Sequence, residues 1–385
     1  MRSPAINEHQ VHTFLEGLFG EDLHAKRVLS LSLATLGVIQ AASLSVYAIG
    51  QALAIARGTQ GKHGVKQVDR LLSNGGIDVW HLFSFWVPYL LGQRTEAVVS
   101  LDWTDFEADD QTTLVASLKT KHGRSTPLVW ITVQKSGLKG VRNDVEDALL
   151  LRLRECIPPQ VKVTLLADRG FADQKLYALL ERLGFEYVIR FRQDITVTSQ
   201  KAERRIASEW VPKAGRLRLL KRARVTADEA LVEAVVCVKK KGMKEPWCLA
   251  TSLSEASGAE VVALYSRRFC IEEKFRDIKD LRFGMGLSAM HIAEPERRDR
   301  LLLVCAMAGV LLTLLGAAGE SLGMERYLKA NTSKRKRRTY SLFRQGCFYY
   351  QALPNMREAE LRPLIERFAQ LVIEQPVFRE VFGLV

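Results

Sequence analysis

The sequence predicts a mixed α/β protein whose strand-rich core is interrupted by an all-β insertion and flanked by helical regions. Three observations predict this class. Strand and helix patterns alternate over 96–192, strand patterns alone fill 193–258, and helical spacing dominates the two ends of the chain. The predicted regions are a helical region at 1–92, the first part of the core at 93–192, the insertion at 193–258, the helical part of the core at 259–320, and a basic, helical C-terminal region at 321–385.

The helical region at the start of the chain has two parts. Val28 to Ala56 contains no charged residue but several Ser, Thr and Gln, a composition typical of two packed helices rather than a membrane span. Gly58 to Gly76 follows and contains Lys62, His63, Lys66 and Arg70. A small basic helical domain of this kind can contact DNA, although a plain packing bundle remains an alternative.

The core begins with three strand patterns at 96–106, 111–120 and 127–135, which predict an antiparallel meander. A helix over 145–156, a buried strand over 161–171, a helix closed by Gly184 and a strand over 186–192 follow in that order. The order β-β-β-α-β-α-β matches the ribonuclease H-like fold. Residues 193–258 then interrupt it with basic, strand-like runs.

A long apolar segment lies in the last third of the chain. Leu301 to Gly319 carries no charge and is long enough to span a bilayer. A helix that is buried on all sides in a domain core has the same composition, and nothing else in the chain is typical of a membrane protein. We therefore expect a core helix and no membrane.

The charge of the chain favours a polyanionic partner. Its 385 residues include 56 Lys or Arg and 43 Asp or Glu, for a net charge of +13. The excess positive charge lies in residues 199–224 and 321–350. These segments could bind a polyanion, or they could be solvated loops that aid solubility. The strongest candidate for contact with nucleic acid is the run of Lys334, Arg335, Lys336, Arg337 and Arg338.

The six cysteines form no CxxC pair, which excludes the common zinc modules and a disulfide framework of the usual spacing. Free cysteines are typical of a reducing compartment. The N-terminus also lacks the apolar core of a signal peptide. Both features predict a cytoplasmic protein.

Two aspartates follow buried strand patterns at places where a metal ion could bind. Asp102 lies near the end of the first strand and Asp168 at the tip of the fourth, and these strands are neighbours in a ribonuclease H-like sheet. Two carboxylates on one rim repel each other unless a cation lies between them, and Mg²⁺ or Mn²⁺ suits oxygen ligands. Arg169 and Arg190 follow strand tips on the same rim and are candidates for phosphate contacts. An ordinary surface aspartate at a strand end is the alternative for each acid.

A third acid lies on a predicted helix between basic residues. The spacing Y-x2-R-x3-E-x6-K places Tyr265, Arg268, Glu272 and Lys279 within an arc of roughly 60° on one helix face. Glu273 would point about 100° away. A structural ladder of ion pairs would have the same spacing, since Arg268 and Glu272 form an ordinary i,i+4 pair.

This signature resembles that of DDE transposases of the insertion-sequence-4 family. LDWT around Asp102 and LADRGF around Asp168 resemble the first-acid and second-acid motifs of that family, and an all-β insertion before the Glu is a family trait. The resemblance extends from about residue 25 to 350. Trp103, directly after the first acid, departs from the family pattern.

The resemblance implies cut-and-paste transposition. Asp102, Asp168 and Glu272 would hold two Mg²⁺ or Mn²⁺ ions, which would support hydrolysis at the ends of a mobile element and attack of the freed 3′-hydroxyl on target DNA. Arg268 and Lys279 would hold phosphates on either side of the scissile bond, and Tyr265 would bind a phosphate nearby.

Further implied features concern the DNA and the assembly. Trp247 resembles a family position that stacks on a base extruded from the duplex, although a Trp in a β-sheet core is the alternative. The partners would be double-stranded DNA with terminal inverted repeats and target DNA, bound by a homodimer on the nucleoid of a bacterial cytoplasm. The amphipathic segment Pro354 to Gln375 would supply a dimer contact or pack on its own chain.

Besides a membrane protein, two rival functions remain open on the sequence. One is a metal-dependent nuclease on the same fold, which would cleave DNA without joining strands. The other is a non-catalytic DNA-binding protein derived from a transposase, which would keep its function when the three acids are replaced.

Overall fold

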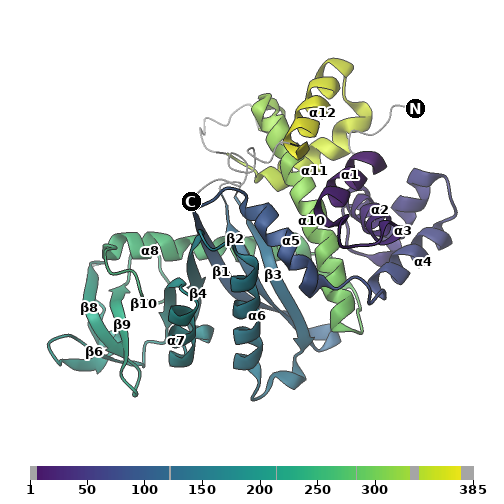
Figure 1. Cartoon of the computed structure of the whole chain (residues 1–385). Coiled ribbons are helices and arrows are strands. Elements are labelled where there is room, and N and C mark those ends of the chain that lie inside the picture. The colour runs from purple at the N-terminus through teal and green to yellow at the C-terminus, as the bar shows by residue number, and fades with distance from the viewer. Residues whose placement is uncertain (1–6, 121–122, 214, 283, 330–337, 374–385) are drawn as a thin grey trace.

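The computed structural model describes residues 7–120, 123–213, 215–282, 284–329 and 338–373. Figure 1 shows three neighbouring parts: a bundle of helices from both ends of the chain, a central sheet with its covering helices, and an outer group of strands.

The N-terminal region is helical, as the sequence predicts. Its helices are α1 (Glu8–Phe19), α2 (Ala25–Ala41), α3 (Val46–Arg57), α4 (Gly61–Leu72) and α5 (Val79–Leu91). The uncharged segment forms α2 and α3, which meet at 99°. Helices α3 and α4 cross closely because Gly50 and Gly64 have no side chains, and a Cβ on either would overlap the facing backbone.

The first part of the core has the predicted element order. The elements are β1 (Glu96–Phe106), β2 (Gln111–Lys119), β3 (Ser125–Gln134), α6 (Arg142–Cys156), β4 (Lys162–Ala167), α7 (Gln174–Arg182) and β5 (Glu186–Phe191). The strands lie in the order β3-β2-β1-β4-β5. The first three are antiparallel, whereas β4 runs parallel to both β1 and β5. Crossover helices α6 and α7 make these parallel pairings possible.

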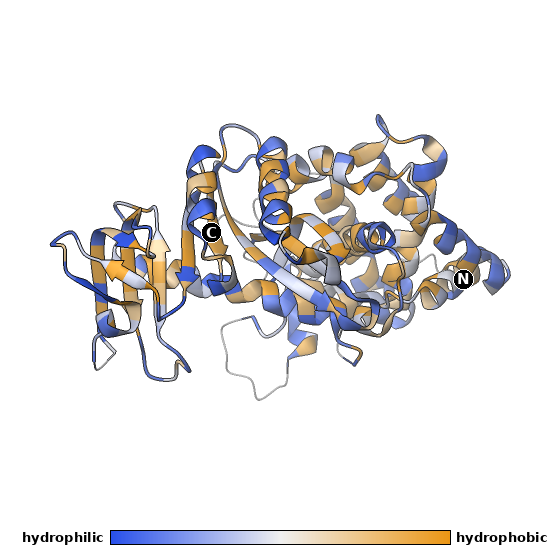
Figure 2. Cartoon of the chain, turned by 90° about the horizontal axis from the view of Figure 1, so that it is seen from below, coloured by the Kyte–Doolittle hydropathy of each residue, from blue (hydrophilic) through white to orange (hydrophobic). Residues whose placement is uncertain are grey.

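The strands of the predicted insertion continue this sheet. They are β6 (Thr196–Thr198), β7 (Arg204–Ile206), β8 (Leu217–Val225), β9 (Ala230–Val238) and β10 (Trp247–Thr251). Because β10 pairs with β5, one ten-stranded sheet runs through both parts, and it continues in the order β10-β9-β8-β6-β7. Figure 2 shows hydrophilic and hydrophobic residues side by side on the outer strands, where the basic residues of β8 lie.

The remaining elements are helical: α8 (Gly258–Ser266), α9 (Cys270–Lys279), α10 (Pro295–Ser321), α11 (Leu342–Ala352) and α12 (Glu358–Ile373). A short 3-10 helix, η5 (Arg267–Phe269), separates α8 from α9. The predicted uninterrupted helix from Tyr265 to Lys279 is therefore wrong in one detail. The tighter winding of a 3-10 turn changes the angles between residues on its two sides.

Helix α10 contains the long apolar segment and forms the centre of the helical part. It is the one single helix in the described residues that is long and apolar enough to cross a membrane, and 89% of its most apolar stretch is buried inside the protein. It packs against α2, α11, α12 and β3. This burial agrees with the expectation of a core helix.

Helix α12 contains most of the amphipathic C-terminal segment. Its apolar residues Leu361, Leu364, Phe368 and Leu371 are buried, and the helix packs against α10 and α1 of the same chain. The apolar face of α12 is therefore covered within the chain.

Candidate active site

The two aspartates follow neighbouring parallel strands. Leu101 of β1 and Ala167 of β4 are the last register partners, so Asp102 and Asp168 come next on the same edge of the sheet. Asp168 directly follows β4, and its carboxylate accepts a hydrogen bond of 2.8 Å from the backbone N–H of Gly170. The register thus places Asp168, at the carboxyl end of β4, beside Asp102, which lies within the longer strand β1.

The third acid is joined to the first through an arginine. Arg268 donates from Nη1 to Oδ2 of Asp102 over 3.0 Å and from Nη2 to Oε1 of Glu272 over 2.6 Å. Its side chain is only 8% exposed. Arg268 therefore places one positive charge between two acids that come from different elements.

The acidity of Asp102 is set by its burial and by its charged neighbours. Burial raises the pKa of Asp102 to about 6, and the negative charges of Asp168 and Glu272 add to the rise while Arg268 opposes it. The influence of both other acids on this pKa indicates that the three carboxylates share one electrostatic neighbourhood. Concentrated negative charge of this kind favours a bound cation.

Tyr265 and Trp247 pack beside this site. Tyr265, at the end of α8, is 1% exposed, and burial raises its pKa. The Trp247 ring meets it edge-on, with centroids 4.9 Å apart, and lies 6.0 Å from the ring of Phe269. Tyr265 is thus an internal residue that borders the acids, whereas Trp247 is half-buried at the start of β10.

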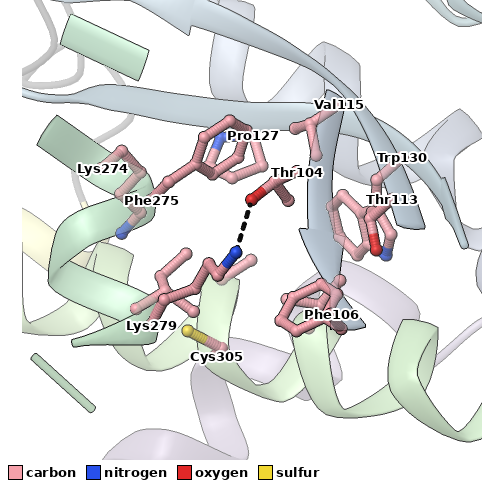
Figure 3. Close-up of a pocket in the computed structure, with 13 residues that line it drawn as sticks. Thr104, Phe106, Thr113, Val115, Pro127, Trp130, Lys274, Phe275, Lys279 and Cys305 are labelled. Carbon is pink, nitrogen blue, oxygen red and sulfur yellow. Dashed lines mark hydrogen bonds between the residues drawn. The ribbon is translucent and has the colours of Figure 1, made fainter. Parts of the chain in front are cut away.

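Lys279 lies further along α9 and points toward β1. Its ammonium donates to Thr104 Oγ1 over 3.2 Å and to the carbonyl oxygen of Asp105, and it lies 4.8 Å from the centre of the Phe106 ring (Figure 3). Burial lowers the pKa of Lys279. A small, largely apolar cavity of about 30 Å³ adjoins this contact. Lys279 therefore fastens α9 to the strand that carries Asp102.

The two rim arginines share one acidic partner. Arg169 Nη1 lies 3.1 Å and Arg190 Nη2 lies 2.7 Å from Oε2 of Glu245, in the turn before β10. This contact joins both arginines to the turn that leads into β10. Glu245 partly neutralises both arginines.

The basic run is only partly described. Lys334, Arg335, Lys336 and Arg337 lie outside the described residues. Arg338 donates from Nε to Oε2 of Glu320 at the end of α10, over 2.7 Å.

Sequence reasoning missed a cleft beside the two aspartates. It has a volume of about 530 Å³, and its lining includes Asp102, Asp168, Trp103, Lys135 and Arg142. The i,i+4 spacing of Arg142 and Glu146 is visible in the sequence, but the neighbouring position of Trp103 depends on the packing of α6 on the sheet.

The residues at the sheet edge fit a hard divalent cation in their chemistry. All three acids offer carboxylate oxygens, the ligands that Mg²⁺ and Mn²⁺ prefer. Among the residues that the structure describes, no three His, Cys, Asp or Glu side chains already have the arrangement of a metal site. Arg268 instead balances part of the charge.

Comparison with known proteins gives one family. The family model described as "Transposase DDE domain" matches residues 94–311. The matched segment covers more than half of the chain and contains all three acids. No curated protein matches the chain.

Proposed function

The chain belongs to the family of DDE transposases, and on this premise we propose that it is a cut-and-paste transposase of the insertion-sequence-4 type. The Tyr265, Arg268, Glu272 and Lys279 signature supports the finer assignment. The strand order β3-β2-β1-β4-β5 supports a ribonuclease H-like core, with β6 to β10 as the insertion between Asp168 and Glu272.

The carboxylates of Asp102, Asp168 and Glu272 would hold two Mg²⁺ or Mn²⁺ ions. When bound, such a metal pair supplies an activated water or 3′-hydroxyl and stabilises the charge of an in-line phosphoryl displacement. The adjacent positions of Asp102 and Asp168 and the link from Asp102 through Arg268 to Glu272 are the observation that carries this proposal.

The basic residues would act on the DNA backbone. Arg268 pairs with two acids. If metal ions bound those carboxylates, its guanidinium would become available to a DNA phosphate. Arg169 and Arg190 would release the exposed carboxylate of Glu245 and bind DNA phosphates in its place. Lys279 would set the distance between α9 and β1 through its contacts with Thr104 and Asp105. Its ammonium would also bind a DNA phosphate. Tyr265 is buried and would support Arg268, and its phosphate contact would require its hydroxyl to become exposed when DNA binds.

Trp247 would stack on an extruded base if the second strand is cut through a hairpin. Its partial exposure and its aromatic neighbours Tyr265 and Phe269 support a preformed stacking platform. A Trp247→Ala protein that resolves hairpins at the wild-type rate would remove this role.

The DNA partners would be the inverted repeats that bound the element and the target DNA. The basic residues Lys334 to Arg338, the strands of 199–224 and the N-terminal helices would enlarge the DNA contact. Because two ends must be paired before cleavage, we propose a homodimer on DNA in a bacterial cytoplasm. Because the apolar face of α12 is buried within the chain, the dimer contact would lie on another surface.

The deciding experiment is strand joining with Mg²⁺. Duplex DNA carrying the inverted repeats found beside the gene, already cut at its 3′ end, is mixed with a supercoiled target. Joined product from the wild-type protein, but not from Asp168→Asn, supports a transposase. Cleavage without joining would indicate a nuclease, and DNA binding that is indifferent to all three acids would indicate a non-catalytic regulator.

A further inference from the structure

Arg142, the first residue of α6, lies on the wall of the cleft that contains Asp102 and Asp168. Successive residues of a strand point to opposite faces of the sheet. Asp102 accordingly meets Arg268, whereas the next residue, Trp103, meets α6 on the other face. Arg142 and Arg268 therefore approach the aspartates from opposite faces of the sheet.

Three side chains fix the position of Arg142. Its Nε donates to Oε1 of Glu146 over 2.9 Å, and the indole Nε1 of Trp103 donates to the same oxygen over 2.8 Å. The guanidinium carbon lies 5.2 Å from the centre of the Trp103 ring and 5.9 Å from that of Phe171. Glu146 is buried, so its end of this contact is shielded from water. The arginine is thus held by one carboxylate and two aromatic rings.

The terminal nitrogens of Arg142 remain available to a ligand. Within the described part of the chain, its Nη1 and Nη2 atoms have no hydrogen-bond acceptor, and 47% of the side chain is exposed. Lys135, the other cation of the cleft, differs because Asp105 and Glu107 both bind its ammonium, over 2.9 and 2.6 Å. Arg142 therefore offers the cleft two donors that no protein group uses.

Gly170 keeps the space between Arg142 and Asp168 open. A Cβ atom at this position would lie 3.0 Å from Oδ1 of Asp168 and 3.8 Å from Nη2 of Arg142. The free end of the guanidinium is therefore close to the second acid, and no side chain separates them. An anion that enters the cleft beside Asp168 would meet this end.

We propose that Arg142 forms a phosphate-binding subsite for the DNA strand that enters the cleft, with Trp103, Phe171 and Glu146 as its positioning residues. This inference rests on the proposed function and deepens it. A guanidinium can bind two phosphate oxygens at once, which a lysine cannot do with the same geometry. Because Arg142 is already held in place, little conformational freedom is lost when the phosphate binds. A residue with a purely structural role would not need its terminal donors turned to the cleft.

The test compares Arg142→Ala and Arg142→Lys with Arg182→Ala. Arg182 is an exposed arginine in the last turn of α7. Because α7 connects the parallel strands β4 and β5, it runs back from the end of the sheet that carries Asp168, so Arg182 matches the lost charge without the position. Binding of inverted-repeat duplex is measured by fluorescence anisotropy in EDTA over a series of salt concentrations. Steady-state strand joining in Mg²⁺ provides KM and kcat, and thermal unfolding verifies folding.

We expect Arg142→Ala to weaken DNA binding roughly tenfold, the loss typical of one charged hydrogen-bonded contact. The slope of log affinity against log salt should fall by about 1, the contribution of one phosphate. Arg142→Lys should keep the slope but bind more weakly than wild type, because it keeps the charge and loses the planar fork. Arg182→Ala should match wild type in slope and affinity.

The outcomes separate this inference from the proposed function. If Arg142→Ala is folded but matches Arg182→Ala in affinity and slope, the subsite does not exist. If Arg142→Ala is unfolded, Arg142→Lys decides: wild-type affinity and KM would overturn the subsite, and weakened binding with an unchanged melting temperature would support it. A wild-type protein that neither binds nor joins the DNA would instead overturn the proposed function.

Discussion

The Nη1 atom of Arg268 lies 3.0 Å from the Oδ2 atom of Asp102, so an arginine from η5 neutralises an acid of β1. The same guanidinium reaches Glu272 over 2.6 Å. The Arg268 guanidinium therefore holds two carboxylates from different elements near each other. The replacement of Arg268, the competition between Arg268 and Mg²⁺ for the carboxylates, and the titration of Asp102 can each be tested.

Neutralising any of the three acids should abolish catalysis and leave DNA binding largely intact. We expect Asp102→Asn, Asp168→Asn and Glu272→Gln to lower the rate of DNA cleavage by roughly 100-fold or more, because each amide weakens metal binding. Gel-based cleavage assays with Mg²⁺ measure the rate. Glu273→Gln, on the same helix, is the matched control because Glu273 pairs with Arg124 and Arg276 instead. Equal rates for Glu272→Gln and Glu273→Gln would contradict a catalytic Glu272.

Replacing Arg268 should destabilise the metal-free protein more than the metal-bound one. Arg268→Met leaves the half-buried Asp102 without its cation, which should cost about 1–3 kcal/mol of unfolding free energy after allowance for the exposure of Glu272. Divalent ions would supply the missing charge, so the deficit should shrink in Mg²⁺. Urea unfolding with EDTA or Mg²⁺ measures both values, with the exposed neighbour variant Arg267→Met as control. An identical deficit in the two conditions would limit Arg268 to a structural ion pair.

The affinity for Mg²⁺ should fall as the pH drops through about 6. Burial raises the pKa of Asp102 to about 6 from 3.8, so its carboxylate becomes protonated at a higher pH than an exposed aspartate. A protonated carboxyl is a poor metal ligand, and binding must then release the proton. Isothermal titration with Mg²⁺ between about pH 5 and 7 measures the effect. A flat affinity over this range would show that Asp102 does not take up a proton there.

The metal-free protein should show the opposite trend in stability. The folded state binds the proton of Asp102 more tightly than the unfolded state does, because the folded pKa is the higher one. Unfolding free energy should therefore decrease as the pH rises from about 4 to about 6, by at most about 1.4 kcal/mol per pH unit from this group. The Asp102→Asn protein should lose this component of the pH dependence.

The crossing of α10 and α11 should tolerate no side chain at its centre. A Cβ on Gly316 would overlap the carbonyl oxygen of Leu342, and one on Gly346 would overlap that of Leu312. Gly346→Val should lower the unfolding free energy by about 2–3 kcal/mol, because the helices must separate. Gly17→Ala, on an open face of α1, should instead change stability by less than about 1 kcal/mol and in the stabilising direction. Thermal unfolding compares them, and similar melting temperatures would contradict the close crossing.

Local sequence patterns account for most elements of the core. Alternating Val and Leu residues predict β1 to β5, and the two helices between them follow from their apolar spacing and end signals. These features depend on neighbours in the chain, so a sequence window contains the information. The i,i+4 contact of Arg268 with Glu272 is local in the same sense.

The tertiary structure alone decided which distant residues lie together around Asp102, Asp168 and Glu272. The sequence contained the unbroken spacing from Tyr265 to Lys279, but η5 interrupts that helix. In the folded chain Arg268 contacts Asp102, and Lys279 contacts Thr104. Nothing near Trp103 in the chain indicates that its indole meets Glu146 and carries Arg142. Such contacts join segments that are far apart in the chain, and their formation depends on how the sheet and its covering helices bury their apolar faces together. The sequence therefore determined the local elements and the types of residue at the site, and packing decided which of these residues point inward and which face the cleft.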